Sequence, residues 1–322
     1  MDVEVFAPIA SDLAAVEALL RSEISHDPPE VSGPMAELFG AGGKRLRPAL
    51  VLLAAKLGRY DLAKLAPAAM AVELTHAATL VHDDVIDRAP TRRGRPTVAA
   101  SLGDEPAIVV GDYYLVKASE LASQTGSAEV VAILARAVME ICAGEVRQQS
   151  RRFRFALEED TYMQWIHDKT ATLLAACCDI GSLLGELKQK DRSALHNYGI
   201  YLGLAFQIAD DVLDYTAAAG EIGKPIGHDL AEGFATLPLM MAMQDKGFLS
   251  KSRDVLNAGR ALSADEAERI STLVRSSDGP RRAIERARSL ADEAHKQLDF
   301  IGSSAAREAL AALTEYVVKR TF

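Results

Sequence analysis

Two aspartate motifs carry the strongest chemical signal in this sequence. Both have the pattern DDxxD, and both lie within apolar segments. The two sets of carboxylates are Asp83, Asp84 and Asp87, and Asp210, Asp211 and Asp214. Residues four apart share one face of a helix, so the first and last carboxylates of each motif should point the same way.

Several carboxylates on one apolar helix repel one another and resist burial. One such cluster can be a solvated helix end, but two clusters with the same spacing and similar flanks need a common cause. Hard divalent cations provide it, because magnesium takes oxygen ligands and often shares them with substrate phosphates. The motifs therefore predict two helices that face each other across a cavity and hold a diphosphate through bridging magnesium ions.

Two basic segments could hold further phosphate groups. One is Gly42-Gly43-Lys44-Arg45-Leu46-Arg47-Pro48, and the other is Arg92-Arg93-Gly94-Arg95, which soon follows the first aspartate motif. Arginine pairs with phosphate in a bidentate way. Most basic clusters are solvated surface, yet a basic strip beside a carboxylate cluster suggests two anionic groups held together.

The elements that must position these residues are helices. Apolar residues recur at spacings of three and four, and alternating strand-like runs are nearly absent. Pro48 should open a helix, Ser263 and Glu266 predict a capping box, and Gly279-Pro280 should start the next helix. Six further helices are expected, at about 10–25, 63–86, 104–123, 127–153, 159–186 and 189–217.

The central segments are apolar around most of their circumference, which is typical of helices buried inside a bundle. No low-complexity linker or fixed-period repeat divides the chain. We therefore predict an all-α fold, a single large helical bundle, with one domain over residues 1–322.

Composition narrows the class of protein. The 322 residues are 49% hydrophobic and 25% charged, as in ordinary globular proteins. A net charge of −9 argues against a nucleic-acid partner, since phosphate backbones need a basic face. Three cysteines without CxxC spacing suggest reduced thiols. No apolar run reaches the ~18 residues of a membrane span, and the acidic N-terminus is unlike a secretory signal. We expect no transmembrane segment and a cytoplasmic location.

Eight motifs together resemble the trans-isoprenyl diphosphate synthases. They occur in the order and spacing of that family from about residue 40 to 245, while both ends match only as generic helices. The motifs are GGKRLRP, HAATLVHDDVID, TRRGRPT, GDYYLVKA, GEVRQQ, the Lys169-Thr170 pair, FQIADDVLD and GKPIGHDLAEG.

The resemblance implies the isoprenoid synthase fold, with a deep central cavity, and usually a homodimer. It also implies a magnesium-dependent prenyltransferase. Such an enzyme condenses isopentenyl diphosphate with an allylic diphosphate by ionisation, condensation and elimination, and makes a longer trans-polyprenyl diphosphate.

The resemblance also assigns roles to individual residues. Both aspartate motifs would bind metal, with three Mg2+ per active site held together with diphosphate. Thr170 and Gln207 would lie beside the developing allylic cation. The isopentenyl diphosphate site would consist of Lys44, Arg47, His76 and Arg93. The allylic diphosphate would be held by Arg92, Lys169 and Lys224.

Two alternatives to a synthase stay open. A class I terpene cyclase shares the fold and the first aspartate motif, but it needs no isopentenyl diphosphate site and has a different second motif. A non-catalytic partner subunit of another prenyl synthase usually lacks one aspartate motif, and both are present here.

Two positions predict details of the reaction. Ala78 and Thr79 lie about one turn before Asp83, where short-chain members of the family place an aromatic floor, so we expect a long product, beyond farnesyl. In the segment Glu232-Gly233-Phe234, Phe234 replaces a lysine that the family uses to hold the allylic diphosphate. This segment should be a loop. Either related enzymes tolerate other residues at this position, or the change weakens allylic binding.

Overall fold

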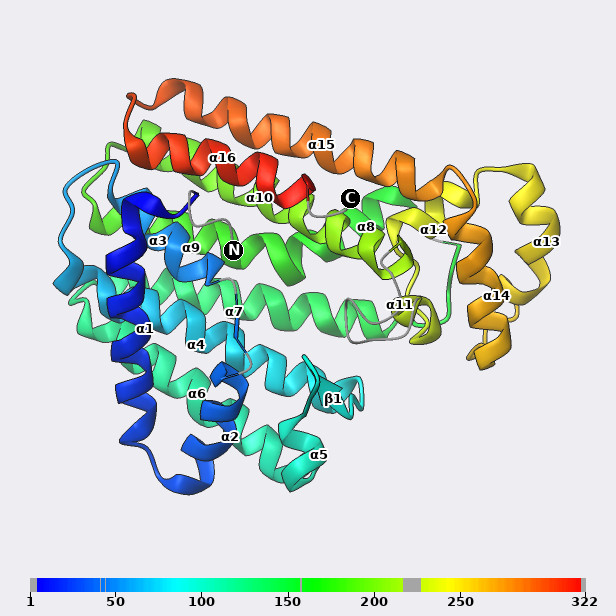
Figure 1. Ribbon diagram of the computed structural model, residues 1–322, viewed down its shortest axis with the longest axis horizontal. Coiled ribbons are helices and arrows are strands. Elements are labelled where there is room, and N and C mark those ends of the chain that lie inside the picture. Colours follow the sequence, from blue (N-terminus) through cyan, green and yellow to red (C-terminus); the bar gives the residue numbers. More distant parts are fainter. Residues whose placement is uncertain (1–4, 41, 44, 157, 217–226, 320–322) are drawn as a thin grey trace. The chain divides into compact units, whose positions relative to one another are not determined.

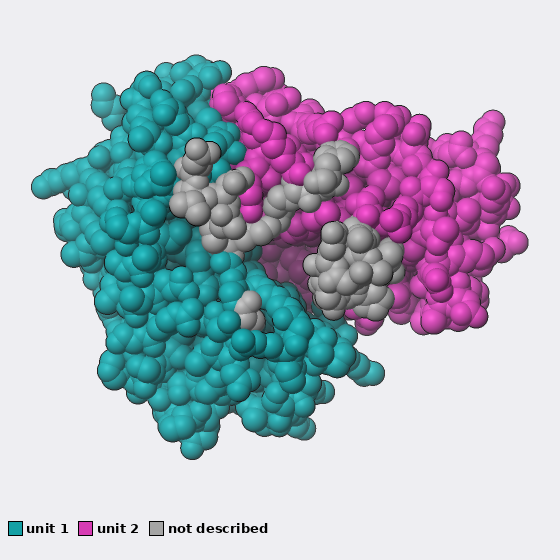
Figure 2. Space-filling model, viewed as in Figure 1, with its two compact units in different colours: residues 1–138, 173–196, 297–312 teal, residues 139–172, 197–296, 313–322 magenta. Residues whose placement is uncertain are grey.

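The computed structural model describes residues 5–40, 42–43, 45–156, 158–216 and 227–319. Almost all of its regular structure is helical, apart from one short two-stranded hairpin among the described residues (Figure 1). This confirms the all-α prediction. The chain divides into two compact units, coloured separately in Figure 2.

Unit 1 comprises residues 1–138, 173–196 and 297–312, and unit 2 comprises residues 139–172, 197–296 and 313–322. Four helices are shared substantially between the units: α7 (Ala128–Gln149), α9 (Thr172–Leu184), α10 (Gln189–Thr216) and α16 (Ala305–Lys319); α15 (Gly279–Gln297) contributes only its last residue, Gln297, to unit 1. The expectation of one domain over 1–322 stays a prediction.

Most of the other elements of unit 1 lie in the first 124 residues of the chain, and η3 lies near its end. They are η1 (Ala7–Ile9), α1 (Ala10–Ser25), α2 (Pro29–Gly40), α3 (Leu46–Ala55), α4 (Leu62–Ile86), β1 (Thr91–Arg92), β2 (Arg95–Pro96), α5 (Val98–Leu102), α6 (Asp104–Gln124) and η3 (Leu298–Phe300). At the centre of this unit α4 packs against α3 and α6. Its alanine-rich sequence has apolar residues on all sides, and most of its side chains are buried.

The other elements of unit 2 lie between residues 159 and 297. They are α8 (Glu159–Ile166), η2 (His167–Ala171), α11 (His228–Ala231), α12 (Leu237–Ala242), α13 (Lys246–Leu256), α14 (Ala264–Arg275) and α15 (Gly279–Gln297). The predicted capping box is confirmed: the Ser263 hydroxyl accepts from the backbone N–H of Glu266, and the Glu266 carboxylate accepts from that of Ser263.

Two helices near the N-terminus begin differently from the prediction, and both contain proline. The helix expected at about 10–25 is confirmed as α1, but a second helix, α2, then begins at Pro29 and contains Pro34, where none was predicted. Pro48 lies at the third position of α3 rather than the first. Pro29 and Pro48 are tolerated because the first four N–H groups of a helix have no partner inside it. Pro34, the sixth residue of α2, lies beyond that first turn.

The long helix expected at 159–186 is interrupted by a π-helical turn, η2. Two glycines on neighbouring helices leave room for its wider backbone. A Cβ added at Gly144 of α7 would lie 2.6 Å from the Asp168 Cβ, and one added at Gly203 of α10 would lie 2.4 Å from the Ala171 Cα. Such π-turns are frequent at functional sites, and this one carries Lys169 and Thr170.

Candidate active site

The first aspartate motif forms the C-terminal end of α4. Asp83 and Asp87 are half-buried, whereas the side chain of Asp84 is only 3% exposed. The Asp84 carboxylate is held by Arg92 of β1: the Arg92 Nε lies 2.9 Å from Oδ1 and 3.0 Å from Oδ2, and Nη2 lies 2.8 Å from Oδ1. The hairpin after α4 thus brings a predicted diphosphate ligand onto a predicted metal ligand.

The predicted isopentenyl diphosphate residues also gather in unit 1. Burial and the guanidinium groups of Arg47 and Arg93 hold the pKa of His76 well below its usual value, so the imidazole is neutral at pH 7. Burial and the neighbouring Arg92 lower the pKa of Arg93. Arg47, His76 and Arg93 therefore form one group, called here the basic cluster.

Arg45, in the same basic motif, has a structural role instead. It is buried, with Nη1 3.0 Å from the Glu73 carboxylate and Nη2 3.2 Å from that of Glu17, and it also donates to the Phe39 carbonyl. This network fixes the start of α3 and so places Arg47. Two predicted ligands, Lys44 and Lys224, lie outside the described residues.

In unit 2 the π-turn η2 presents Lys169 and Thr170. The Lys169 Nζ donates to the Glu145 carboxylate at 2.8 Å and to the Gln148 amide oxygen at 3.3 Å, both on α7. The Thr170 hydroxyl donates to the Gln207 side-chain oxygen at 2.7 Å. The two residues that the sequence placed beside the developing cation are therefore in direct contact.

The second aspartate motif lies at the C-terminal end of α10, also in unit 2. The Asp211 carboxylate is buried and accepts from the Tyr162 hydroxyl at 2.6 Å and from the Gln207 amide at 2.8 Å. Burial and the nearby Asp229 carboxylate raise the pKa of Asp211 well above its usual value. Asp210 is half-buried. The Asp214 carboxylate accepts from the backbone N–H groups of His228 and Asp229, both at 3.2 Å, and so begins α11.

The two motifs share one arrangement. In each, the middle aspartate is buried and anchored by protein donors: Arg92 holds Asp84, and Tyr162 with Gln207 holds Asp211. The outer aspartates are half-buried in both motifs. Each motif thus separates an inward anchor from outer carboxylates that can meet a cation.

The donor chemistry of these residues fits magnesium. Within the described ranges no three His, Cys, Asp or Glu side chains converge as a complete metal site. Magnesium rarely needs such a cage, because it keeps several waters and is usually bound by one or two carboxylates together with substrate phosphates. Asp83, Asp87 and Asp210 supply the hard oxygen ligands that this kind of site requires.

Sequence reasoning missed several residues of the site. Glu145 and Gln148 lie within the motif GEVRQQ, and Asp229 lies within GKPIGHDLAEG, so the motifs themselves contained the signal. The sequence signal for Tyr162 was weaker. This tyrosine precedes Lys169 by two helical turns, and its hydroxyl needs a hydrogen-bond partner if it is buried. Its contact with Asp211 joins α8 to α10, which no local pattern shows.

The predicted chain-length residues lie on α4 before the first aspartate motif. Ala78 is fully buried, and Thr79 is half-buried with its hydroxyl donating to the His76 carbonyl at 2.8 Å. Both side chains are small, as the sequence argument for a long product requires.

Phe234 lies in a segment without helix or strand, as predicted. It is not solvated, however, since only 8% of the residue is exposed. Its ring centroid lies 5.7 Å from that of Trp165, and the Arg152 guanidinium lies 5.7 Å from the Phe234 ring centre. Arg152 also forms an ion pair with Glu232 and donates to its carbonyl at 2.5 Å, so the loop is fixed to the end of α7.

The chain is similar to several known proteins over most of its length. The family model for polyprenyl synthetase matches residues 28–273. The chain is 37% identical to heptaprenyl diphosphate synthase component 2 of Geobacillus stearothermophilus, over 98% of this chain and 97% of the relative. It is 34% identical to nonaprenyl diphosphate synthase of Mycobacterium tuberculosis, over 98% of this chain and 94% of the relative.

Solved structures show the same fold. A polyprenyl synthase of Caulobacter crescentus, in complex with calcium and isoprenyl diphosphate, matches with a TM-score of 0.93 and 34% identity, over 99% of this chain and 98% of that one. A decaprenyl diphosphate synthase of Rhodobacter capsulatus matches with a TM-score of 0.90 and 36% identity, over 99% and 98%. The chain therefore belongs to the polyprenyl synthetase family and has the all-α isoprenoid synthase fold.

Proposed function

We propose that this chain is a magnesium-dependent trans-polyprenyl diphosphate synthase that condenses isopentenyl diphosphate with an allylic diphosphate. The observation that carries the proposal is the basic cluster of Arg47, His76 and Arg93 in the same unit as the first aspartate motif. A cyclase acts on one diphosphate and has no use for a second anion site. Prenyl chain elongation needs both.

The neutral His76 suits an isopentenyl diphosphate site. Two guanidinium groups near it disfavour a third positive charge, so the imidazole can donate one hydrogen bond and accept another. Arg47 and Arg93 supply the charge that the diphosphate requires, in the bidentate geometry that guanidinium favours.

Breaking the allylic carbon–oxygen bond places negative charge on the leaving diphosphate. Magnesium would supply Lewis-acid stabilisation of that charge, held by the outer aspartates of the two motifs. Lys169 would add a cation, which Glu145 and Gln148 keep oriented before substrate arrives. Arg92, which pairs with Asp84 in the free protein, would add a second cation.

Thr170 and Gln207 are oriented for the carbocation. The Thr170 hydroxyl proton is directed at the Gln207 oxygen, while the Gln207 amide N–H donates to Asp211. The Thr170 oxygen lone pairs therefore remain available to a developing positive charge, as an oriented dipole would. The proton lost after condensation would leave with the diphosphate group.

The product is long, beyond farnesyl. The small, buried Ala78 supports this, together with relatives named for heptaprenyl and nonaprenyl products.

None of the helices in the described part of the chain is long and apolar enough to cross a membrane. We place the protein in the cytoplasm as one domain over residues 1–322, which agrees with free thiols at Cys177 and Cys178.

We further propose a homodimer. On α7, Met139 and Val146 are 70% and 71% exposed and lie two turns apart on one face; on α6, Val109 and Val116 have the same spacing and are also exposed. Such apolar stripes on a surface mark interfaces. Assembly with a second polypeptide is the alternative, because two relatives are named component 2 of their synthase. Sedimentation of the purified chain decides: a monomer without activity would favour the alternative.

Incorporation of labelled isopentenyl diphosphate tests the function. We expect incorporation into an allylic primer that requires Mg2+ and falls at least tenfold in Arg93→Gln. A hydrocarbon formed from the allylic diphosphate alone would support a cyclase. No incorporation with any primer would support the non-catalytic partner subunit.

A further inference from the structure

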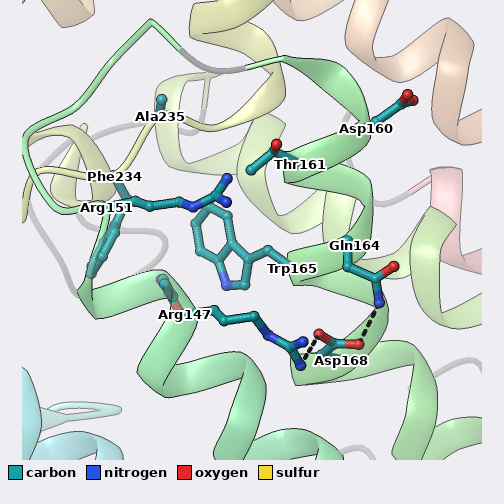
Figure 3. A pocket seen from close by; sticks show the side chains of 10 residues that line it. Arg147, Arg151, Asp160, Thr161, Gln164, Trp165, Asp168, Phe234 and Ala235 are labelled. Carbon is teal, nitrogen blue, oxygen red and sulfur yellow. Dashed lines mark hydrogen bonds and ion pairs between the residues drawn. The ribbon is translucent and has the colours of Figure 1, made fainter.

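Unit 2 contains a pocket of about 260 Å³ where the end of α7 meets α8 and η2 (Figure 3). One wall contains Arg147 of α7 and Arg151, which follows α7. The other walls are formed by polar and aromatic residues of α8 and by the loop that carries Phe234 and Ala235. None of the described residues proposed above as ligands for a diphosphate or a metal lines it, although Phe234 occupies the position of the family's lysine.

Two guanidinium groups and two carboxylates line this pocket, and only one guanidinium is paired within it. Arg147 lies 2.7 Å from the Asp168 carboxylate, which also accepts from the Gln164 amide at 2.7 Å, so the buried Asp168 is balanced. Arg151 is exposed and has no ion-pair partner within the described part of the chain. Asp160 points away from both arginines (Figure 3). The Arg151 guanidinium thus faces the pocket with its hydrogen-bonding capacity available.

The aromatic wall has an unsatisfied donor of its own. The Trp165 indole nitrogen is buried and has no hydrogen-bond acceptor among the described residues. An indole N–H can only donate, and a buried donor without a partner costs about 1–3 kcal/mol. Beside it the rings of Trp165 and Phe234 are tilted by 48°, and Ala235 continues the apolar surface. Arg151 and the Trp165 N–H thus place two donors beside an apolar wall.

We propose that this pocket binds an organic phosphate with a short apolar chain, at a site separate from the two diphosphate sites. Arg151 and the Trp165 N–H would take the phosphate oxygens, and Trp165 and Phe234 would hold the hydrocarbon. The choice of ligand rests on the proposed function, whose substrates and products are isoprenoid phosphates of this kind. In this proposal Phe234 forms part of the wall of a new site, and its presence is not simply the loss of a phosphate-binding lysine.

The pocket is linked to the reaction centre. Gln148 lines it and also accepts from Lys169, and Asp168 precedes Lys169 in the π-turn η2. A bound anion that competes with Asp168 for Arg147 would disturb the turn that orients Lys169. Binding of a ligand in the pocket should therefore change the turnover of the enzyme, and a product bound there would regulate its own synthesis.

The only tryptophan in the chain, Trp165, makes the test direct. Geranyl diphosphate is titrated in EDTA, which removes metal-dependent binding, while tryptophan emission is recorded. We expect a saturable change whose dissociation constant rises at least tenfold in Arg151→Gln. The matched control Arg154→Gln removes an exposed arginine outside the pocket and should leave the constant unchanged, as should Arg93→Gln in the basic cluster. No saturable change, or an equal constant in Arg151→Gln, overturns the site.

Two further arms complete the experiment. Inorganic pyrophosphate should bind at least tenfold more weakly than geranyl diphosphate, because it cannot use the aromatic wall; equal affinity overturns the assignment of an apolar chain. Turnover with Mg2+ is assayed on the same sample. Turnover without the fluorescence change refutes the pocket alone, whereas the fluorescence change without turnover refutes the proposed function and supports the pocket.

Discussion

Replacing Arg92 by glutamine tests the ion pair that holds Asp84 in the absence of metal. The Asp84 side chain is 3% exposed and that of Arg92 is 21% exposed, with Arg92 nitrogens 2.8–3.0 Å from the Asp84 oxygens. Removing one partner of a buried pair costs about 3–5 kcal/mol, because the other charge stays buried without compensation. Partial exposure of Arg92 places this case at the lower end, about 3 kcal/mol.

For a chain of this size that loss corresponds to a fall in Tm of roughly 5 °C. The assay is thermal unfolding in EDTA, supported by the urea midpoint. Arg95→Gln is the matched control, since it removes an exposed arginine of the same hairpin. Adding Asp84→Asn to Arg92→Gln should restore most of the loss, because the buried charge is then gone. If Arg92→Gln melts within 1 °C of both the wild type and Arg95→Gln, the ion pair does not anchor Asp84.

Four further variants test the site. Asp83→Ala and Asp210→Ala should each lower kcat by orders of magnitude, yet hold or raise the Tm without Mg2+, since a repelling carboxylate is removed; lower stability with normal turnover would contradict the metal role. Ala78→Phe should shorten the product, as read by mass spectrometry, and an unchanged length would remove Ala78 from the tail's path. Phe234→Lys should lower the Tm, because it puts a second cation beside Arg152 in a buried loop. If the allylic KM falls in Phe234→Lys while that for isopentenyl diphosphate holds, the lysine contact of the family is restored; if neither KM changes, the correspondence at this position is wrong.

Helix starts could be predicted from the sequence where a capping side chain marks the N-terminus of the helix. Asp61 accepts from the Ala63 N–H at the start of α4, and Ser263 with Glu266 begins α14, so both starts could be read from the chain. α2 was missed because prolines usually mark a break, although the first turn of a helix accepts them. The π-turn η2 depends on Gly144 and Gly203, which lie on other helices, so no local pattern shows it.

The candidate site was predictable as a set of residues but not as a set of contacts. Spacing identified the aspartates, and the family resemblance placed Thr170 and Gln207 beside the developing cation. It gave no sign that Arg92 holds Asp84 or that Tyr162 holds Asp211. These contacts join residues from different elements, and their partners in the free protein differ from those proposed in the reaction.

The mass of the product formed from excess isopentenyl diphosphate tests the central claim most directly. With Mg2+ and an allylic primer, the unmodified chain should yield a series of diphosphates that differ by one isoprene unit and end well beyond fifteen carbons, and EDTA should abolish the series. A product that stops mainly at fifteen carbons would contradict the long-chain assignment. Complete absence of elongation with every allylic primer would contradict the synthase itself.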